Sequence, residues 1–267
     1  MNKISLSVIV SLIISIVLCV LMPVLGFVFS KIKYKKIAKP FFLGALAFFI
    51  SQIALRLPIL QIILPKFSWY GAFSVNHPVL YCLFLGLSAG VFEETARFIF
   101  LKGFFKKGLR FGDGIAFGIG HGGIEVILIT VISLINTLVC VFAINNGTLN
   151  SLMASSPQAQ IDSTSMALYN LSELSIFMGV VERISAMAMH IGMTMIIVVG
   201  INKSKSFLYL LAAIFVHCII DTLCGILPML GINGWLLEGV LAIFAIALIA
   251  YTVFAKKHNF DEKGVKL

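Results

Sequence analysis

The sequence predicts an all-α fold, a polytopic bundle of about seven transmembrane helices, on the strength of three observations. Hydrophobic residues fill 60% of the 267 positions and charged residues only 12%, against roughly 25% charged residues in an ordinary soluble domain. Apolar runs near the ~20 residues that a bilayer requires recur along the chain. Basic segments alternate with segments that contain almost no basic residue. This composition excludes a soluble globular protein, and the whole chain, 1–267, is expected to form one integral membrane domain.

The apolar runs define the expected helices. They cover residues 4–30, 40–64, 78–101, 113–144, 173–201, 206–230 and 235–255. The first run is too long for the apolar part of a cleaved signal peptide and lacks a clear small-residue cleavage site, so we expect a true span. The fourth run is longer than a simple span, so we expect it to tilt or to continue beyond the membrane.

The distribution of charge predicts the topology. The net charge of +9 lies in short clusters between apolar runs, which indicates an orientation signal and no nucleic-acid partner. The clusters follow the first, third, fifth and seventh runs, at 31–39, 102–110, 202–205 and from Lys256 onward. Because basic loops stay in the cytoplasm, we expect the amino terminus outside and the carboxyl terminus in the cytoplasm. The polar loop 145–172 is then external, and we interpret it as a solvated linker rather than a lid.

Ionisable residues inside the apolar runs are the main functional signal, because a charge at the bilayer centre costs at least ~2.5–3.5 kcal/mol. The segment VFEETARFIF, at 91–100, holds Glu93, Glu94 and Arg97. Arg97 lies one helical turn from both glutamates and can neutralise one of them. The other glutamate is then a candidate general base for activating water.

Other spans place ionisable residues at a similar depth. Three pairs share a helix face by their spacing: His121 with Glu125, His217 with Asp221, and Arg183 with His190. At ~1.5 Å per residue from the basic boundaries, the glutamate pair and three histidines fall in one layer of the cytoplasmic half of the bilayer. Any single pair could be a structural strut between helices, but the convergence of the whole set favours a functional site. Arg56 has no local partner, and we expect a structural ion pair with Glu182 or Glu125.

Three motifs resemble those of the CAAX prenyl protease and bacteriocin-processing superfamily of intramembrane proteases. They are Glu93-Glu94-x-x-Arg97, Phe117-x-x-x-His121 and His217-x-x-x-Asp221. The run HGGIE at 121–125, followed by Glu182-Arg183 and His190, resembles the YhfC branch, which is related to the PrsW proteases. The resemblance covers roughly residues 93–221 of this chain. It implies hydrolysis of peptide bonds in membrane-associated peptides or proteins, near the cytoplasmic face of a bacterial cytoplasmic membrane.

The resemblance also implies roles for residues. The expected catalytic set is Glu93, Glu94, Arg97, His121, Glu125, His217 and Asp221, with Glu182, Arg183 and His190 in support. One of the two glutamates would activate water with the help of His121, and His217 with Asp221 would form the oxyanion group. Asp221 stands where the superfamily more often has Asn. Because an ionised Asp cannot donate a hydrogen bond, Asp221 would be protonated, bind a metal or orient His217.

Two mechanisms fit these residues. The favoured one is metal-independent hydrolysis with a glutamate base, because the compact HExxH motif of zinc proteases is missing. The alternative is a zinc site held by His121, His190 and His217, with Glu125 or Asp221 as a fourth ligand or behind the ligands, and with Glu94 as the base. No cofactor is therefore favoured, and zinc is the alternative.

Two other classes of protein stay open. Buried carboxylates and histidines also form proton relays, so a proton-coupled transporter is one alternative. The glycine-rich run 112–123 could break the fourth span in the way that transporter helices are broken, or could let a substrate backbone approach His121. The other alternative is a non-catalytic membrane scaffold or immunity protein that keeps a protease fold.

Overall fold

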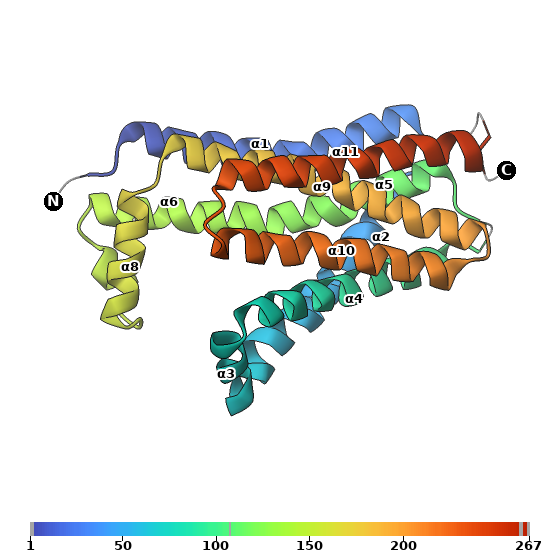
Figure 1. Ribbon diagram of the computed structural model, residues 1–267. Coiled ribbons are helices and arrows are strands. Elements are labelled where there is room, and N and C mark those ends of the chain that lie inside the picture. The colour runs from blue at the N-terminus through green and yellow to red at the C-terminus, as the bar shows by residue number, and fades with distance from the viewer. Residues whose placement is uncertain (1–2, 107, 262–263, 266–267) are drawn as a thin grey trace. The chain divides into compact units, whose positions relative to one another are not determined.

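A computed structural model describes residues 3–106, 108–261 and 264–265 of the chain (Figure 1). The regular elements of these residues are all helices, with no β-strand among them, and seven helical segments are long and apolar enough to cross a membrane. The predicted all-α class and the seven predicted spans are confirmed, with boundaries that differ by a few residues. The orientation of the termini stays a prediction.

Five spans are single helices: α1 (Leu6–Lys33), α4 (Pro78–Phe104), α9 (Glu173–Asn202), α10 (Ser206–Met229) and α11 (Gly234–Asn259). Two are composite. The second span joins α2 (Ala38–Phe48), the π-helical η1 (Phe49–Arg56) and η2 (Ile59–Ile63), and the 3₁₀ turn η3 (Leu64–Lys66). The fourth span joins α5 (Phe111–Glu125), the π-helical η4 (Val126–Val131) and α6 (Ile132–Asn145). Three shorter helices complete the chain: α3 (Ser68–Asn76), α7 (Leu149–Leu152) and α8 (Gln158–Tyr169).

The described residues form two compact units. The first contains α1 up to Met22, the segment from η4 to α8, and α9 up to Arg183. Its core comprises Ile4, Val8, Leu12, Val141, Ala143, Ile144, Leu149, Ile161, Leu168 and Ile176. The loop predicted as a solvated linker thus contains two helices, and α8 buries Ile161 and Leu168, because its apolar residues are spaced by helical turns in a polar sequence. Its external location stays a prediction, as does the single integral membrane domain.

The second unit, Pro23–Glu125 with Ile184–Leu267, contains the rest of the helices. Its core includes Met189, Met193 and the run 195–199 of α9, so this half of α9 lies inside the unit. Helix α10 packs along α4, and α2 packs along α5 (Figure 1). These two helix pairs and α9 supply all the buried ionisable residues of the candidate site.

Glycines bring α5 into close contact with α2 and α9. A Cβ built on Gly120 of α5 would lie 1.9 Å from the carbonyl oxygen of Phe41, and one built on Gly44 of α2 would lie 2.1 Å from that of Phe117. A Cβ on Gly118 would lie 2.6 Å from Cα of Ile191 in α9. Helix α5 is continuous through this run. The glycines therefore neither break the span nor leave room for a substrate backbone, because neighbouring helices occupy the space that side chains would fill.

Candidate active site

Four helices of the second unit bring six ionisable side chains together. Helix α4 contributes Glu93, Glu94 and Arg97, α5 contributes His121, α9 contributes His190, and α10 contributes His217. All six residues are buried. The ring centroids of His121 and His190 are 5.0 Å apart, and those of His190 and His217 are 6.1 Å apart. The layer predicted from sequence depth is thus one cluster of side chains.

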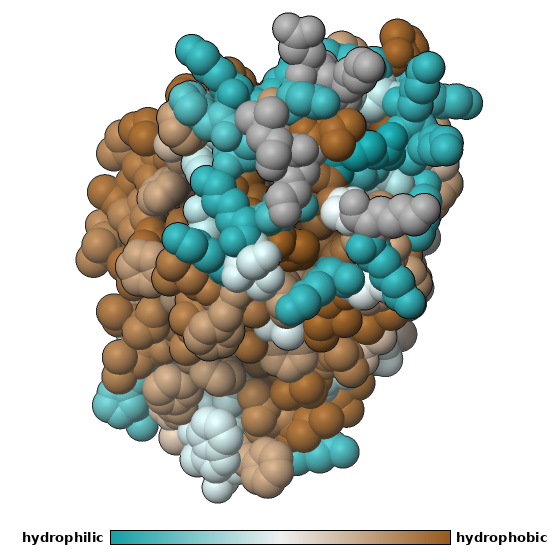
Figure 2. Space-filling model, turned by 90° about the vertical axis from the view of Figure 1, so that its right-hand side faces the viewer, coloured by the Kyte–Doolittle hydropathy of each residue, from teal (hydrophilic) through white to brown (hydrophobic). Residues whose placement is uncertain are grey.

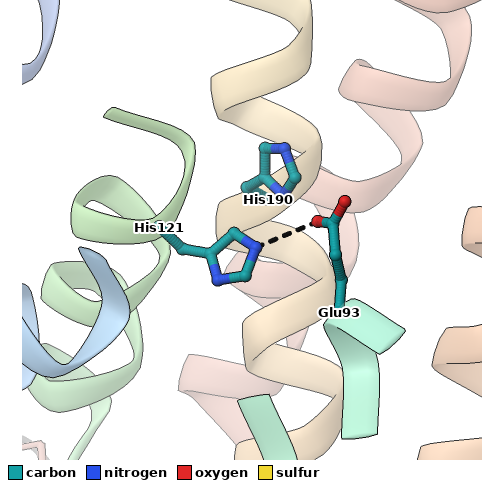
Figure 3. A group of neighbouring side chains, drawn as sticks. All are labelled: Glu93, His121 and His190. Carbon is teal, nitrogen blue, oxygen red and sulfur yellow. Dashed lines mark hydrogen bonds and ion pairs between the residues drawn. The ribbon is translucent and has the colours of Figure 1, made fainter. Parts of the chain in front are cut away.

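Glu93 is held through both carboxylate oxygens, and Figure 3 shows its contact with His121. Its Oε2 accepts a hydrogen bond from Nε2 of His121 at 3.0 Å, and its Oε1 accepts one from Nε2 of Gln52 at 2.7 Å. His121 is packed by the rings of Phe48 and Phe117, at centroid distances of 5.4 and 6.4 Å. The carboxylate and the imidazole therefore have fixed positions before any substrate arrives.

Glu94 faces different partners. Its Oε2 lies 3.4 Å from Nε of Arg97, and its Oε1 accepts a hydrogen bond from Nδ1 of His217 at 2.8 Å. Both members of the Glu94–Arg97 pair are fully buried. Removing one partner of such a buried ion pair strongly destabilises a protein, because the other charge is left buried without compensation. Glu94 is therefore the glutamate that the arginine neutralises.

Arg97 also fixes the tautomer of His190. Its guanidinium donates to the His190 backbone oxygen and to Oγ1 of Thr194, both at 3.0 Å, and faces Nδ1 of His190 at 3.1 Å. A guanidinium has no acceptor, so Nδ1 must accept the hydrogen bond. The proton of a neutral His190 is then on Nε2, which donates to Oε2 of Glu125 at 2.5 Å. Glu125 thus joins the cluster through His190.

Asp221 forms the exposed edge of the site. Its side chain is 38% exposed, and Oδ2 lies 3.6 Å from Nε2 of His217. The same nitrogen lies 3.9 Å from Oε1 of Glu93. His217 therefore stands between a buried carboxylate and an accessible one.

Gln52 is the site residue that the sequence analysis missed. It accepts a hydrogen bond from Nη1 of Arg56 at 3.0 Å and donates to Glu93, so it connects the two. The sequence predicts an ion pair of Arg56 with Glu182 or Glu125. The structure instead has Arg56 donate to Gln52, to Oγ of Ser88 and to the backbone oxygen of Leu85. The sequence does show a polar amide inside an apolar run at this position. An uncharged side chain in a span is, however, only a weak indication of a functional site.

Both composite spans change their helical winding near the site. Gln52 lies within the π-helical segment η1, and η4 begins directly after Glu125. Such π-helical turns inside α-helices occur frequently at functional sites. The winding of each span is therefore irregular where it supplies a polar side chain to the cluster.

The two remaining predicted residues belong to the first unit. Glu182 and Arg183 are neighbours in α9 and form an ion pair with each other. They also line a small cavity of about 200 Å³ with Thr130, Ser133 and Gly179. Their predicted supporting role stays a prediction.

The cluster contains one set of side chains suited to a metal ion. Ligand atoms of Glu93, His121 and His190 all lie within 4.8 Å of one another, and all three residues are buried (Figure 3). One carboxylate and two imidazoles form a donor set known from catalytic zinc sites. Among the described residues, Nδ1 of His121 is buried without a hydrogen-bond partner, while Nε2 faces Glu93. The zinc ligands predicted from the sequence were His121, His190 and His217. In the structure, Glu93 and not His217 completes the set with the other two histidines.

The fold and the cluster define a polytopic integral membrane protein with a buried glutamate and histidine centre. Residues 18–247 match the model of a family described as YhfC intramembrane metalloprotease. The chain is 33% identical over 241 residues to a protein of Bacillus subtilis (strain 168) named "Uncharacterized membrane protein YhfC", covering 89% of this chain and 92% of that protein. No solved structure matches the chain. The chain belongs to the YhfC intramembrane metalloprotease family.

Family membership agrees with the resemblance drawn from the motifs and supports an intramembrane protease. The family description points to a metal-dependent reaction, whereas the sequence analysis favours a metal-independent one. The donor set of Glu93, His121 and His190 makes a metal compatible with the site. The residues of the site are thus compatible with both a metal-dependent and a metal-independent reaction.

Proposed function

We propose that this protein is an intramembrane endopeptidase that hydrolyses peptide bonds of membrane-associated peptides or proteins, with Glu93 as the general base. The observation that carries this proposal is the different surroundings of the two adjacent glutamates. Glu94 is paired with Arg97, while the oxygens of Glu93 accept hydrogen bonds from Gln52 and His121 and have only the titratable His217, at 3.9 Å, as a further neighbour. A carboxylate without a permanent cation is the better proton acceptor.

The reaction can be written with these residues. Glu93 takes a proton from a water molecule, and the resulting hydroxide forms a bond to the carbonyl carbon of the scissile peptide. His121 holds the Glu93 carboxylate in place through its 3.0 Å hydrogen bond. As the carbon–nitrogen bond breaks, the protonated Glu93 returns the proton to the leaving amine. General acid–base catalysis of this kind contributes about 10²- to 10⁴-fold to a rate.

His217 is proposed to bind the oxyanion. In its imidazolium form it donates through Nδ1 to Glu94, and its Nε2 lies on the side of Glu93 and Asp221. An N–H donor next to the attacked carbonyl stabilises the negative charge that develops there. Asp221, which is accessible, then orients His217 and need not donate to the oxyanion itself.

A second candidate is the zinc-dependent form of the same protease, favoured by the donor set and by the family description. Glu93, His121 and His190 would hold the ion. When bound, zinc supplies Lewis-acid chemistry that polarises a carbonyl oxygen and makes water more acidic. Glu93 would then be a ligand, and the role of proton acceptor would pass to Glu94. His190 would have to exchange its hydrogen bond with Arg97 or with Glu125 for the ligand bond.

The test of the proposed function compares carboxylate variants in proteoliposomes. Purified wild type, Glu93→Gln and Glu94→Gln are incubated with solubilised membrane proteins, and new amino termini are quantified by terminal labelling and mass spectrometry. Asp162→Asn, an exposed carboxylate in α8, is the matched control. We expect Glu93→Gln to lower the amount of new amino termini by at least about 100-fold, without a change in the unfolding midpoint. New termini that persist in Glu93→Gln would exclude Glu93 as the base.

The metal question has its own readout. Zinc per chain is measured by elemental mass spectrometry in wild type, His190→Ala and His217→Ala, two buried histidines of which only His190 belongs to the donor set. Near one zinc per chain, lost in His190→Ala and kept in His217→Ala, would establish the zinc-dependent form. Zinc far below one per chain, with cleavage that survives a chelator, would establish the metal-independent form.

A further inference from the structure

A basic cavity lies outside the candidate site, at the predicted cytoplasmic end of the second unit. It has a volume of about 530 Å³ and brings together four cationic side chains from three separate segments of the chain. These are Lys33 at the end of α1, Lys35 just after it, Arg110 before α5, and Lys256 in the last turn of α11. Figure 2 shows hydrophilic side chains gathered on this end of the molecule, above hydrophobic flanks.

Two aromatic rings line the cavity, and two of the cations lie near them. The ring of Phe111 packs against Tyr34 at a centroid distance of 6.0 Å. Nζ of Lys33 lies 5.9 Å from the centroid of the Tyr34 ring, and Nζ of Lys256 lies 5.6 Å from that of Phe111. Partial burial raises the pKa of the Tyr34 hydroxyl, which therefore remains a neutral hydrogen-bond donor. The ammonium groups of Lys33 and Lys256 thus lie beside the aromatic rings that line the cavity.

Within the described part of the chain, no carboxylate of the cavity wall compensates the positive charge. No acidic residue lines the cavity among the described residues. Asp113 pairs with Arg110 through both oxygens, at 3.0 and 2.5 Å. Asp261 accepts a hydrogen bond from the backbone nitrogen of Val265. Three lysines therefore face the cavity with an excess positive charge that favours an anion.

We propose that this cavity binds a phosphate-bearing anion, and that its natural source is the headgroup of an anionic membrane lipid. Basic pockets between transmembrane helices on the cytoplasmic side suit such headgroups, and 530 Å³ lies within the ordinary size of a ligand pocket. The positive-inside rule explains basic residues along the loops. It does not explain why residues from 33–35, 110 and 256 surround one cavity with aromatic support.

The proposal is tested with the full chain in detergent by measuring retention of phosphatidylglycerol against phosphatidylcholine by native mass spectrometry. The test variant is Lys35→Gln/Lys256→Gln, in which two exposed lysines of the cavity lose their charge. The matched control is Lys203→Gln/Lys205→Gln, which removes two exposed lysines from another basic loop on the predicted cytoplasmic side. At about fivefold in affinity for each basic residue near an anionic lipid, we expect about 25-fold weaker phosphatidylglycerol binding in the test variant.

The outcomes separate the two sources of phosphate. Selective loss of phosphatidylglycerol in the test variant, with the control like wild type, supports the lipid site. Thermal protection of wild type by millimolar inorganic phosphate without lipid, lost in the test variant, supports the same anion site with a soluble ligand. Equal weakening in both variants, or equal retention of the two lipids by wild type, overturns the proposal.

Discussion

Replacing Gly120 by alanine tests how the helices position the site. Gly120 of α5 and Gly44 of α2 form a reciprocal contact. Gly120 faces the backbone carbonyl of Phe41 in α2, and Gly44 faces the backbone carbonyl of Phe117 in α5. His121 follows Gly120 directly in α5, and Gln52 lies in the span that contains α2, so a shift of either helix relative to α4 disturbs a hydrogen bond to Glu93. We expect Gly120→Ala to lower stability and to disturb the site together.

The magnitude follows from the distance. A Cβ at position 120 would lie 1.9 Å from the oxygen of Phe41, and ordinary contact begins at 3.4 Å, so the helices must separate by about 1.5 Å (3.4 − 1.9). The neighbouring atom is backbone and cannot rotate away. Overpacking costs about 1–3 kcal/mol in a well-packed core, and here it exceeds the gain of up to about 1 kcal/mol in helix propensity. We expect a net loss of about 1–2 kcal/mol in the free energy of unfolding.

The assay is reversible unfolding of the purified protein in mixed micelles of detergent and SDS, with Gly239→Ala as the matched control. Gly239 lies within α11, and a Cβ there would meet no atom within 4 Å. The control should be neutral or more stable by up to about 1 kcal/mol, because alanine favours helix over glycine. The reasoning is refuted if Gly120→Ala is as stable as Gly239→Ala.

Three further predictions concern single contacts. Gln52→Met should reduce cleavage and also lower the free energy of unfolding by about 1.5–3 kcal/mol, because it removes a buried hydrogen bond to a charged group; new amino termini and SDS unfolding measure the two effects, and undiminished cleavage contradicts the prediction. Arg97→Leu should destabilise the protein by about 3–5 kcal/mol, seen in SDS unfolding, since it leaves a buried carboxylate without its cation. Asn145→Ala removes two hydrogen bonds to the backbone of Ile4, at 2.7 and 3.1 Å, and should accelerate amide hydrogen exchange at Ile4; unchanged exchange would argue against this contact.

The number of membrane spans and their helical structure could be predicted because the bilayer imposes a length and a composition on each span. The seven spans appear as apolar runs, and their ends follow from basic or polar residues. The helices α7 and α8 could not be recognised in this way. Their segment is polar, and their few apolar residues, such as Ile161 and Leu168, gain a partner only through long-range contacts in the first unit.

The site was predictable in its charged members and not in its neutral ones. Glu93, His121 and His217 stand out because an ionisable residue in a span is costly. Gln52 costs much less, and its role depends on the π-helical segment in which it lies. The glycines between 112 and 123 were visible, but the sequence could not tell that helices α2 and α9 fill the space beside them.

The adjacent glutamates are best understood as two residues with separate functions. Neighbours on a helix point about 100° apart, so consecutive carboxylates on α4 must face different helices. Glu93 faces α2 and α5 through Gln52 and His121, and Glu94 faces α10 and its own Arg97. The single turn of α4 therefore supplies one carboxylate that is bound to a cation and one that is not. In the proposed mechanism, this asymmetry keeps the second acidic group available for proton transfer.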